Sequence, residues 1–167
     1  MPPRSGQRAR HHLRDEGADK LAAAREEEKL EEGGKAPWAT FFTRLSLAVN
    51  IAVLVAVCLV LLAFGDSEPV VFVWGPPTAA RGILLSVYLA ILVDSGALLW
   101  LHVRCADKAA VEHMVAALLA TQVLYKVTTP ATAGPANPVA ISNLGISALH
   151  AVTLTLLWRQ HRGRAAS

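Results

Sequence analysis

The sequence predicts an all-α, polytopic membrane protein, in which a bundle of four transmembrane helices follows a charged N-terminal tail. Three observations predict this fold class. Of the 167 residues, 53% are hydrophobic, and the mean hydropathy is positive. Charge is segregated, since 17 of the 29 charged side chains fall within residues 1–44, whereas a soluble domain distributes charge around a closed surface. Apolar runs of about 20 residues, the length that crosses a hydrocarbon core, recur in the remainder.

The tail, residues 1–44, has two parts of different composition. Residues 1–14 carry four arginines, two histidines and no acidic residue, as an organelle-targeting peptide would, although their content of serine and apolar residues is low. Residues 15–35 are highly charged and favour a helix, but they have no apolar stripe wide enough to bury. A solvated or disordered cytoplasmic arm is the first interpretation of this part, and a docking helix for a cytoplasmic partner is the second.

Four apolar runs follow the tail and are predicted to be helices. These runs are residues 45–64, 82–103, 109–126 and 139–158. The first contains no formal charge, and only Asp94 and His102 interrupt the second. The third is short for a span, but burial among the other three would let it cross. Asn137 as N-cap with Pro138 at the first helical position predicts the start of the last run, and Thr78 is the predicted cap of the second.

The basic residues predict the orientation of the bundle. With the N-terminus in the cytoplasm, 14 of the 16 Lys and Arg residues lie inside, in the N-terminal tail, the loop at 104–108 and the short C-terminal tail, 159–167. Only Arg81 and Lys126 lie outside, where Lys126 is interpreted as an interface residue whose amine reaches water. The positive-inside rule therefore predicts that both termini are cytoplasmic, or in a topologically equivalent compartment.

Two further features concern the first outer loop and the cysteines. Residues 70–74 (VVFVW) cannot span a bilayer, so they are expected to lie on the outer interface or to form a short strand against a partner. Cys58 lies in an apolar run and Cys105 in a basic loop. Because the two cysteines occur in regions of different character, both are predicted to be free thiols.

Asp94 is the residue that most invites a functional hypothesis. An Asp at the centre of a span costs about 2.5–3.5 kcal/mol on insertion scales, so it is expected to face other helices or water. His150 lies at the same predicted depth in the last run, where Asn143, Ser147 and His150 form one stripe at i, i+4 and i+7. The sequence therefore predicts an Asp94–His150 contact inside the bundle, with Asn50 nearby, as a proton-binding or ligand-binding site.

Other interpretations of these polar residues stay open. Buried Asp, His and Asn side chains often only hold helices together, at around 0.6 kcal/mol per hydrogen bond, and Asp94 and His150 could also make no contact at all. Weaker candidates are Glu112, His113 and Gln122. The first two fall in the first turn of the third run, where an acidic residue complements the helix dipole and water is near, while Gln122 could face either way.

Several classes of site find no support in the sequence. There is no Gly-rich phosphate loop and no hydrolase or zinc-protease motif. A b-type haem would need two deep histidines, and only His150 is deep, so no cofactor and no metal are expected. A net charge of +3 with mixed signs does not indicate a nucleic-acid partner.

Three functions are compatible with these features. The first is a non-catalytic accessory, scaffold or assembly subunit that binds another membrane subunit, or a second copy of itself, in the bilayer. The second is a small oligomeric proton-coupled transporter or channel that uses Asp94 with His150. The third is a membrane enzyme acting on a lipid-soluble substrate, for which only Asn50 and Ser147 would supply further polar groups near the pair.

Overall fold

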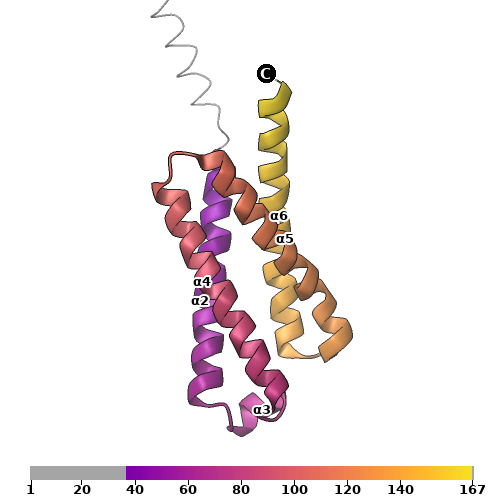
Figure 1. Ribbon diagram of the computed structural model, residues 1–167. Coiled ribbons are helices and arrows are strands. Elements are labelled where there is room, and N and C mark those ends of the chain that lie inside the picture. The colour runs from indigo at the N-terminus through magenta and orange to yellow at the C-terminus, as the bar shows by residue number, and fades with distance from the viewer. Residues whose placement is uncertain (1–36, 167) are drawn as a thin grey trace, which may run out of the picture. The chain divides into compact units, whose positions relative to one another are not determined.

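The computed structural model describes residues 37–166, and in this range the chain is all-α, as the sequence predicts (Figure 1). Its helices are α2 (Pro37–Ala63), α3 (Glu68–Trp74), α4 (Ala79–Arg104), α5 (Lys108–Ala133) and α6 (Pro138–Ala166). The four long helices run alternately up and down in Figure 1, and the short α3 lies in the connection from α2 to α4. The predictions for residues 1–36 lie outside the described residues.

Three of these helices are long and apolar enough to cross a membrane. They are α2 from Trp38, the whole of α4, and α6 as far as Arg164. Helix α5 has 26 residues, which at 1.5 Å each would also reach across a hydrocarbon core, but Glu112, Gln122 and Lys126 make it less apolar. Within residues 37–166 the three candidate spans indicate a multi-pass membrane protein.

The helix starts follow the predicted caps. Thr78 Oγ1 accepts a hydrogen bond from the backbone N–H of Arg81 at 3.4 Å. Asn137 Oδ1 accepts one from the N–H of Val139 at 2.8 Å, immediately after Pro138 at the first helical position. Each cap satisfies a backbone donor that the first turn of a helix leaves without a partner.

The alternative of a short strand for residues 70–74 is wrong, since these residues form most of α3. Pro69 is near the helix start, where its missing N–H costs nothing, and Val70 is buried against α2 and α4. Phe72, on the other side, is 81% exposed. A lone strand would leave its backbone groups unpaired, whereas one short helix satisfies part of them internally.

Two apolar clusters hold the long helices together. The first contains Leu54, Cys58 and Leu61 of α2, Val70 of α3 and Tyr88 of α4, and it joins α2 to α4. The second contains Leu47 of α2, Leu98 of α4, and Val111, Val115 and Leu119 of α5, with Leu154 of α6 packed against it. This second cluster joins the α2–α4 hairpin to the α5–α6 hairpin.

The two ends of the bundle differ in charge. Arginine and lysine residues gather where α4 ends, α5 begins and α6 ends, and this end is called the basic end below. The opposite end holds α3 and the loop between α5 and α6, and is called the α3 end. Residues 159–166, predicted to be part of a short tail, instead continue α6 at the basic end.

Candidate functional site

The interior of the bundle contains many polar side chains. Twelve described polar or charged residues are buried, and they are Thr43, Ser46, Asn50, Ser95, His102, Glu112, Gln122, Lys126, Asn143, Ser147, His150 and Thr153. All four long helices contribute to this set. Polar groups in a membrane interior are costly unless they are paired, so their partners decide what the interior can do.

Asp94 does not belong to this interior, and the expected Asp94–His150 contact is wrong. Helix α4 turns Ser95, Leu98 and His102 inward, whereas Asp94 is exposed on its outer surface. One residue corresponds to about 100° around a helix axis, so Ser95 and Asp94 point to different sides. His150 is 0% exposed, and neither of its ring nitrogens has a hydrogen-bond partner within residues 37–166.

Ser95, rather than Asp94, is the residue of α4 that faces the interior of the bundle at this depth. Asn50 Nδ2 donates to Ser95 Oγ at 2.7 Å, and Ser95 Oγ in turn donates to the carbonyl of Ile91 at 2.7 Å. The amide and the hydroxyl therefore bridge α2 and α4 without a charge. A neutral pair needs no counter-charge inside the bundle, so serine satisfies this contact at a lower cost than a buried carboxylate would.

The outward face around Asp94 carries small residues beside larger apolar ones such as Ile83 and Val87. Gly82, Ser86 and Ala90 precede Asp94 at intervals of four residues, Ala97 follows it, and all five are exposed. Small side chains at this spacing allow the backbone of another helix to approach closely. Within residues 37–166 no ion pair involves the Asp94 carboxylate.

The predicted stripe on α6 points inward. Asn143, Ser147 and His150 are 8%, 4% and 0% exposed. Asn143 Nδ2 donates to Thr129 Oγ1 at 3.1 Å, but Ser147 Oγ has no partner among the described residues. A turn beyond His150, Thr153 Oγ1 lies 2.7 Å from Ser46 Oγ and links α6 to α2.

The Asn50–Ser95 pair gives a direct measure of how strongly these contacts hold the helices. In a double-mutant cycle of Asn50→Ala and Ser95→Ala, we expect a coupling free energy of about 0.6 kcal/mol and at most about 1.7 kcal/mol, the values typical of hydrogen bonds between membrane helices. Unfolding in mixed micelles by a denaturing detergent would measure it. A coupling of several kcal/mol would contradict a purely cohesive role for the pair.

Lys126 was interpreted from the sequence as an interface residue, and this interpretation is wrong. The residue is only 2% exposed. Its Nζ donates to Gln122 Oε1 at 2.8 Å and to the hydroxyl of Tyr125, and it lies 4.4 Å from the centre of the Tyr125 ring. A signal in the sequence could have found it, because Lys126 continues the helical spacing of Val115, Leu119 and Gln122, all of them buried.

A cavity lies beside Lys126, between the two hairpins. Its volume is about 230 Å³, and it is lined by residues of every described helix. A second cavity of about 590 Å³ adjoins it and continues to the α3 end, where Phe72, Ala133 and Asn137 line it. The residues common to both cavities are Val73, Trp74, Tyr88, Tyr125, Val139 and Asn143.

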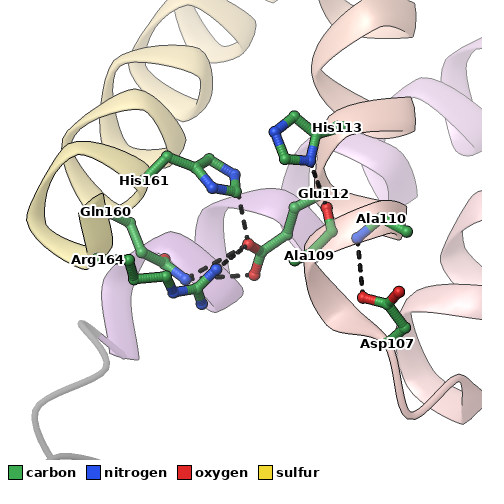
Figure 2. Close-up of polar contacts among 8 residues, drawn as sticks. All are labelled: Asp107, Ala109, Ala110, Glu112, His113, Gln160, His161 and Arg164. Atoms are coloured by element: carbon green, nitrogen blue, oxygen red, sulfur yellow. Dashed lines mark hydrogen bonds and ion pairs between the residues drawn. The ribbon is translucent and has the colours of Figure 1, made fainter.

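Glu112 forms a second polar centre, at the basic end (Figure 2). The residue is 4% exposed, although it lies in the first turns of α5. Its carboxylate accepts hydrogen bonds from Arg164 at 2.9 Å and from Gln160 at 3.3 Å, and His161 Nε2 lies 3.5 Å away. His113 is exposed, and its ring stacks at 4.4 Å on that of His161. The cluster joins the start of α5 to the end of α6.

Neither polar centre resembles a metal site. Within residues 37–166, no three or more His, Cys, Asp and Glu side chains are grouped so that they could hold a metal ion. Cys58 and Cys105 are free thiols in the structure. No protein-family model, curated protein or solved structure matches the chain. Its function must therefore be inferred from its own side chains.

Proposed function

We propose that the chain is a non-catalytic accessory or assembly subunit of a membrane complex, and that it holds another transmembrane protein against the outward face of α4. The observation that carries this proposal is the exposure of Asp94 near the middle of a candidate span. A carboxylate that faces lipid at this depth costs about 2.5–3.5 kcal/mol. A partner helix that brings a cation to Asp94 would offset this cost.

The charges of the chain favour a different protein over a second copy as that partner. Two copies that met symmetrically through α4 would bring two Asp94 carboxylates together in a medium of low dielectric, where like charges repel strongly. Every Lys and Arg of residues 37–166 lies within a few turns of a helix end, and Lys126 is also buried. We therefore infer that the partner is another membrane protein with a Lys, Arg or His near the middle of a helix.

The same proposal includes four spans and a defined orientation. Helices α5 and α6 are joined by Thr129 and Asn143 near one end and by Glu112 and Arg164 at the other, which supports a place for α5 inside the membrane beside the three apolar spans. The basic end would then be cytoplasmic under the positive-inside rule, with both termini on that side. A partner at α4 would approach from the side, within the bilayer.

The separation of Asp94 from His150 favours a subunit over a proton-coupled carrier. A carrier that used both groups needs them on one pathway, whereas Asp94 lies outside α4 and His150 is enclosed. An enzyme would need a second reactive group beside Asp94, and the neighbouring positions Ser86, Ala90 and Ala97 supply one hydroxyl, that of Ser86, eight residues away. Asp94 therefore suits assembly better than chemistry.

The proposal is tested by placing a photo-crosslinking amino acid at Ala97 and purifying the chain from the membranes in which it is made. We expect a cross-link to a transmembrane segment that contains a basic residue. Asp94→Leu should lower the recovery of that partner at least about tenfold, because removal of one member of a desolvated charge pair costs 2 kcal/mol or more. Val93→Leu, at a position that is 68% exposed in the same turn, should leave recovery unchanged.

A charge exchange decides whether the contact is electrostatic. The pair of substitutions Asp94→Lys and Lys or Arg→Asp in the partner should restore recovery, whereas either one alone should abolish it. Cross-linking to a second copy of the chain would overturn the proposal of a different partner. Recovery that is insensitive to Asp94→Leu would overturn the role of Asp94.

A further inference from the structure

Lys126 and Trp74, which line the cavity, each have a hydrogen-bond donor that no acceptor among the described residues satisfies. A lysine ammonium has three N–H groups, and Lys126 uses two of them, on Gln122 and Tyr125. Trp74 lines both cavities, and its indole N–H is buried without a hydrogen-bond partner. These donors belong to different helices, α5 and α3.

The same cavity has no anion of its own. Among the described residues, no Asp or Glu lines either cavity, and no ion pair involves Lys126. A buried ammonium without a counter-charge is costly, because its hydration is lost and no Coulomb attraction replaces it. The site is therefore short of one negatively charged group, which a ligand can bring.

The remaining walls indicate what kind of molecule carries that group. Val53, Leu54 and Val57 of α2 and Ile146 of α6 make one side of the smaller cavity apolar. Ligand pockets in proteins typically have volumes of about 300–1,000 Å³, apolar walls and few polar groups. The smaller cavity lies below this range and the adjoining one within it. The adjoining cavity is lined on part of its wall by apolar residues such as Leu84 and Val139, and elsewhere by threonines of α5. A charged head beside Lys126, with an apolar chain against the apolar walls, fits both cavities.

We propose that this cavity binds an anionic amphiphile, a carboxylate or phosphate on a single hydrocarbon chain, with Lys126 Nζ as the donor to the head group and Trp74 as part of the cavity wall. Charge-assisted hydrogen bonds from an ammonium are roughly twice as strong as neutral ones, so the head group accounts for most of the selectivity. A fatty acid and a single-chain phospholipid share this chemistry. The site is independent of the outward face of α4 and of any partner bound there.

The test uses the fluorescence of Trp74. The other three tryptophans, at 38, 100 and 158, are 63%, 63% and 56% exposed and can be replaced by phenylalanine, which leaves Trp74 as the sole emitter. This chain, in nanodiscs of a zwitterionic phospholipid, is titrated with brominated dodecanoate, brominated dodecyl phosphate and brominated dodecanol. We expect saturable quenching by one or both anionic probes, and affinity for the alcohol that is at least about tenfold weaker.

Four variants separate the contribution of the Lys126 charge from that of the cavity space. Lys126→Met should lower the affinity for the anionic probes about tenfold or more and leave the alcohol unaffected. Lys126→Arg, which keeps the charge, should retain preference for the anionic probes. Lys108→Met removes another lysine of the same helix, whose amine contacts the carbonyl of His102 outside the cavity, and should have no effect. Val57→Phe fills the apolar wall without adding a second tryptophan and should weaken binding of all probes.

The possible results of the titrations lead to different conclusions about the proposed site. Quenching by the carboxylate alone or by the phosphate alone supports the proposal and identifies the natural head group. Equal affinity for the alcohol and the anionic probes overturns it, as does full binding by Lys126→Met or an absence of saturable quenching. Retention of the Asp94-dependent partner by Lys126→Met would show that the two sites act separately.

Discussion

Replacement of Leu119 by alanine is expected to lower the free energy of unfolding by about 2–5 kcal/mol. Leu119 is 0% exposed and belongs to the cluster with Leu47, Leu98 and Val115 that joins the two hairpins. The substitution removes several methylene-sized groups from the place where α2, α4 and α5 meet. Because the α3 end is hollowed by cavities, the cohesion between the hairpins depends on this cluster at the other end.

The cause of the loss differs from that in a soluble core. Lipid chains are as apolar as leucine, so transfer of the side chain out of water contributes little to the association of membrane helices. The cost arises instead from van der Waals contacts that the lining of the new void no longer makes. We therefore expect a value toward the lower end of the range.

Leu124 provides the matched control. It lies on the same helix five residues later and is 67% exposed, so Leu124→Ala should change the free energy of unfolding by no more than about 0.5 kcal/mol. Unfolding of both variants is followed in mixed micelles by circular dichroism against the fraction of denaturing detergent. Equal effects of the two substitutions would mean that the cluster at Leu119 does not join the hairpins.

The existence of the long helices could be predicted because it depends on length and composition alone. Runs of about 20 apolar residues have few other solutions in lipid, where backbone groups must be satisfied within the segment. The caps Thr78 and Asn137 follow from a local rule, and both accept backbone hydrogen bonds in the structure. These features need no information about neighbours.

Which side of α4 points into the bundle could not be predicted in the same way. Its apolar residues occur on every side, so the sequence has no stripe that distinguishes inside from outside. Depth in the membrane constrains position along the axis and says nothing of rotation about it. That is why Asp94 was assigned to the interior, although its neighbour Ser95 faces Asn50.

The predicted contact of Lys126 and Glu112 with water fails for a different reason. It rests on their positions near helix ends, where water is expected. Lys126 follows a buried helical stripe that ends in Gln122, and the stripe was the better guide. Glu112 is buried because α6 continues past residue 158 and brings Gln160 and Arg164 over it, an extension that hydropathy could not reveal.

The contact between Glu112 and Arg164 gives the second large expected effect. In a double-mutant cycle of Glu112→Gln and Arg164→Gln, we expect a coupling free energy of about 0.5–3 kcal/mol. The single substitutions should be unequal. Arg164→Gln leaves a carboxylate that is 5% exposed without its guanidinium partner, whereas Glu112→Gln leaves a guanidinium that is 35% exposed and can turn toward water.

The exposure of Arg164 also makes the effect depend on salt. Because one partner is partly solvated, the coupling should fall as ionic strength rises from low to physiological values and beyond. Arg159→Gln, an exposed position on the same helix, should change stability by less than about 0.5 kcal/mol under either condition. A coupling of zero, or a larger loss from Glu112→Gln than from Arg164→Gln, would show that the carboxylate is not held in the buried position that closes the basic end of the α5–α6 hairpin.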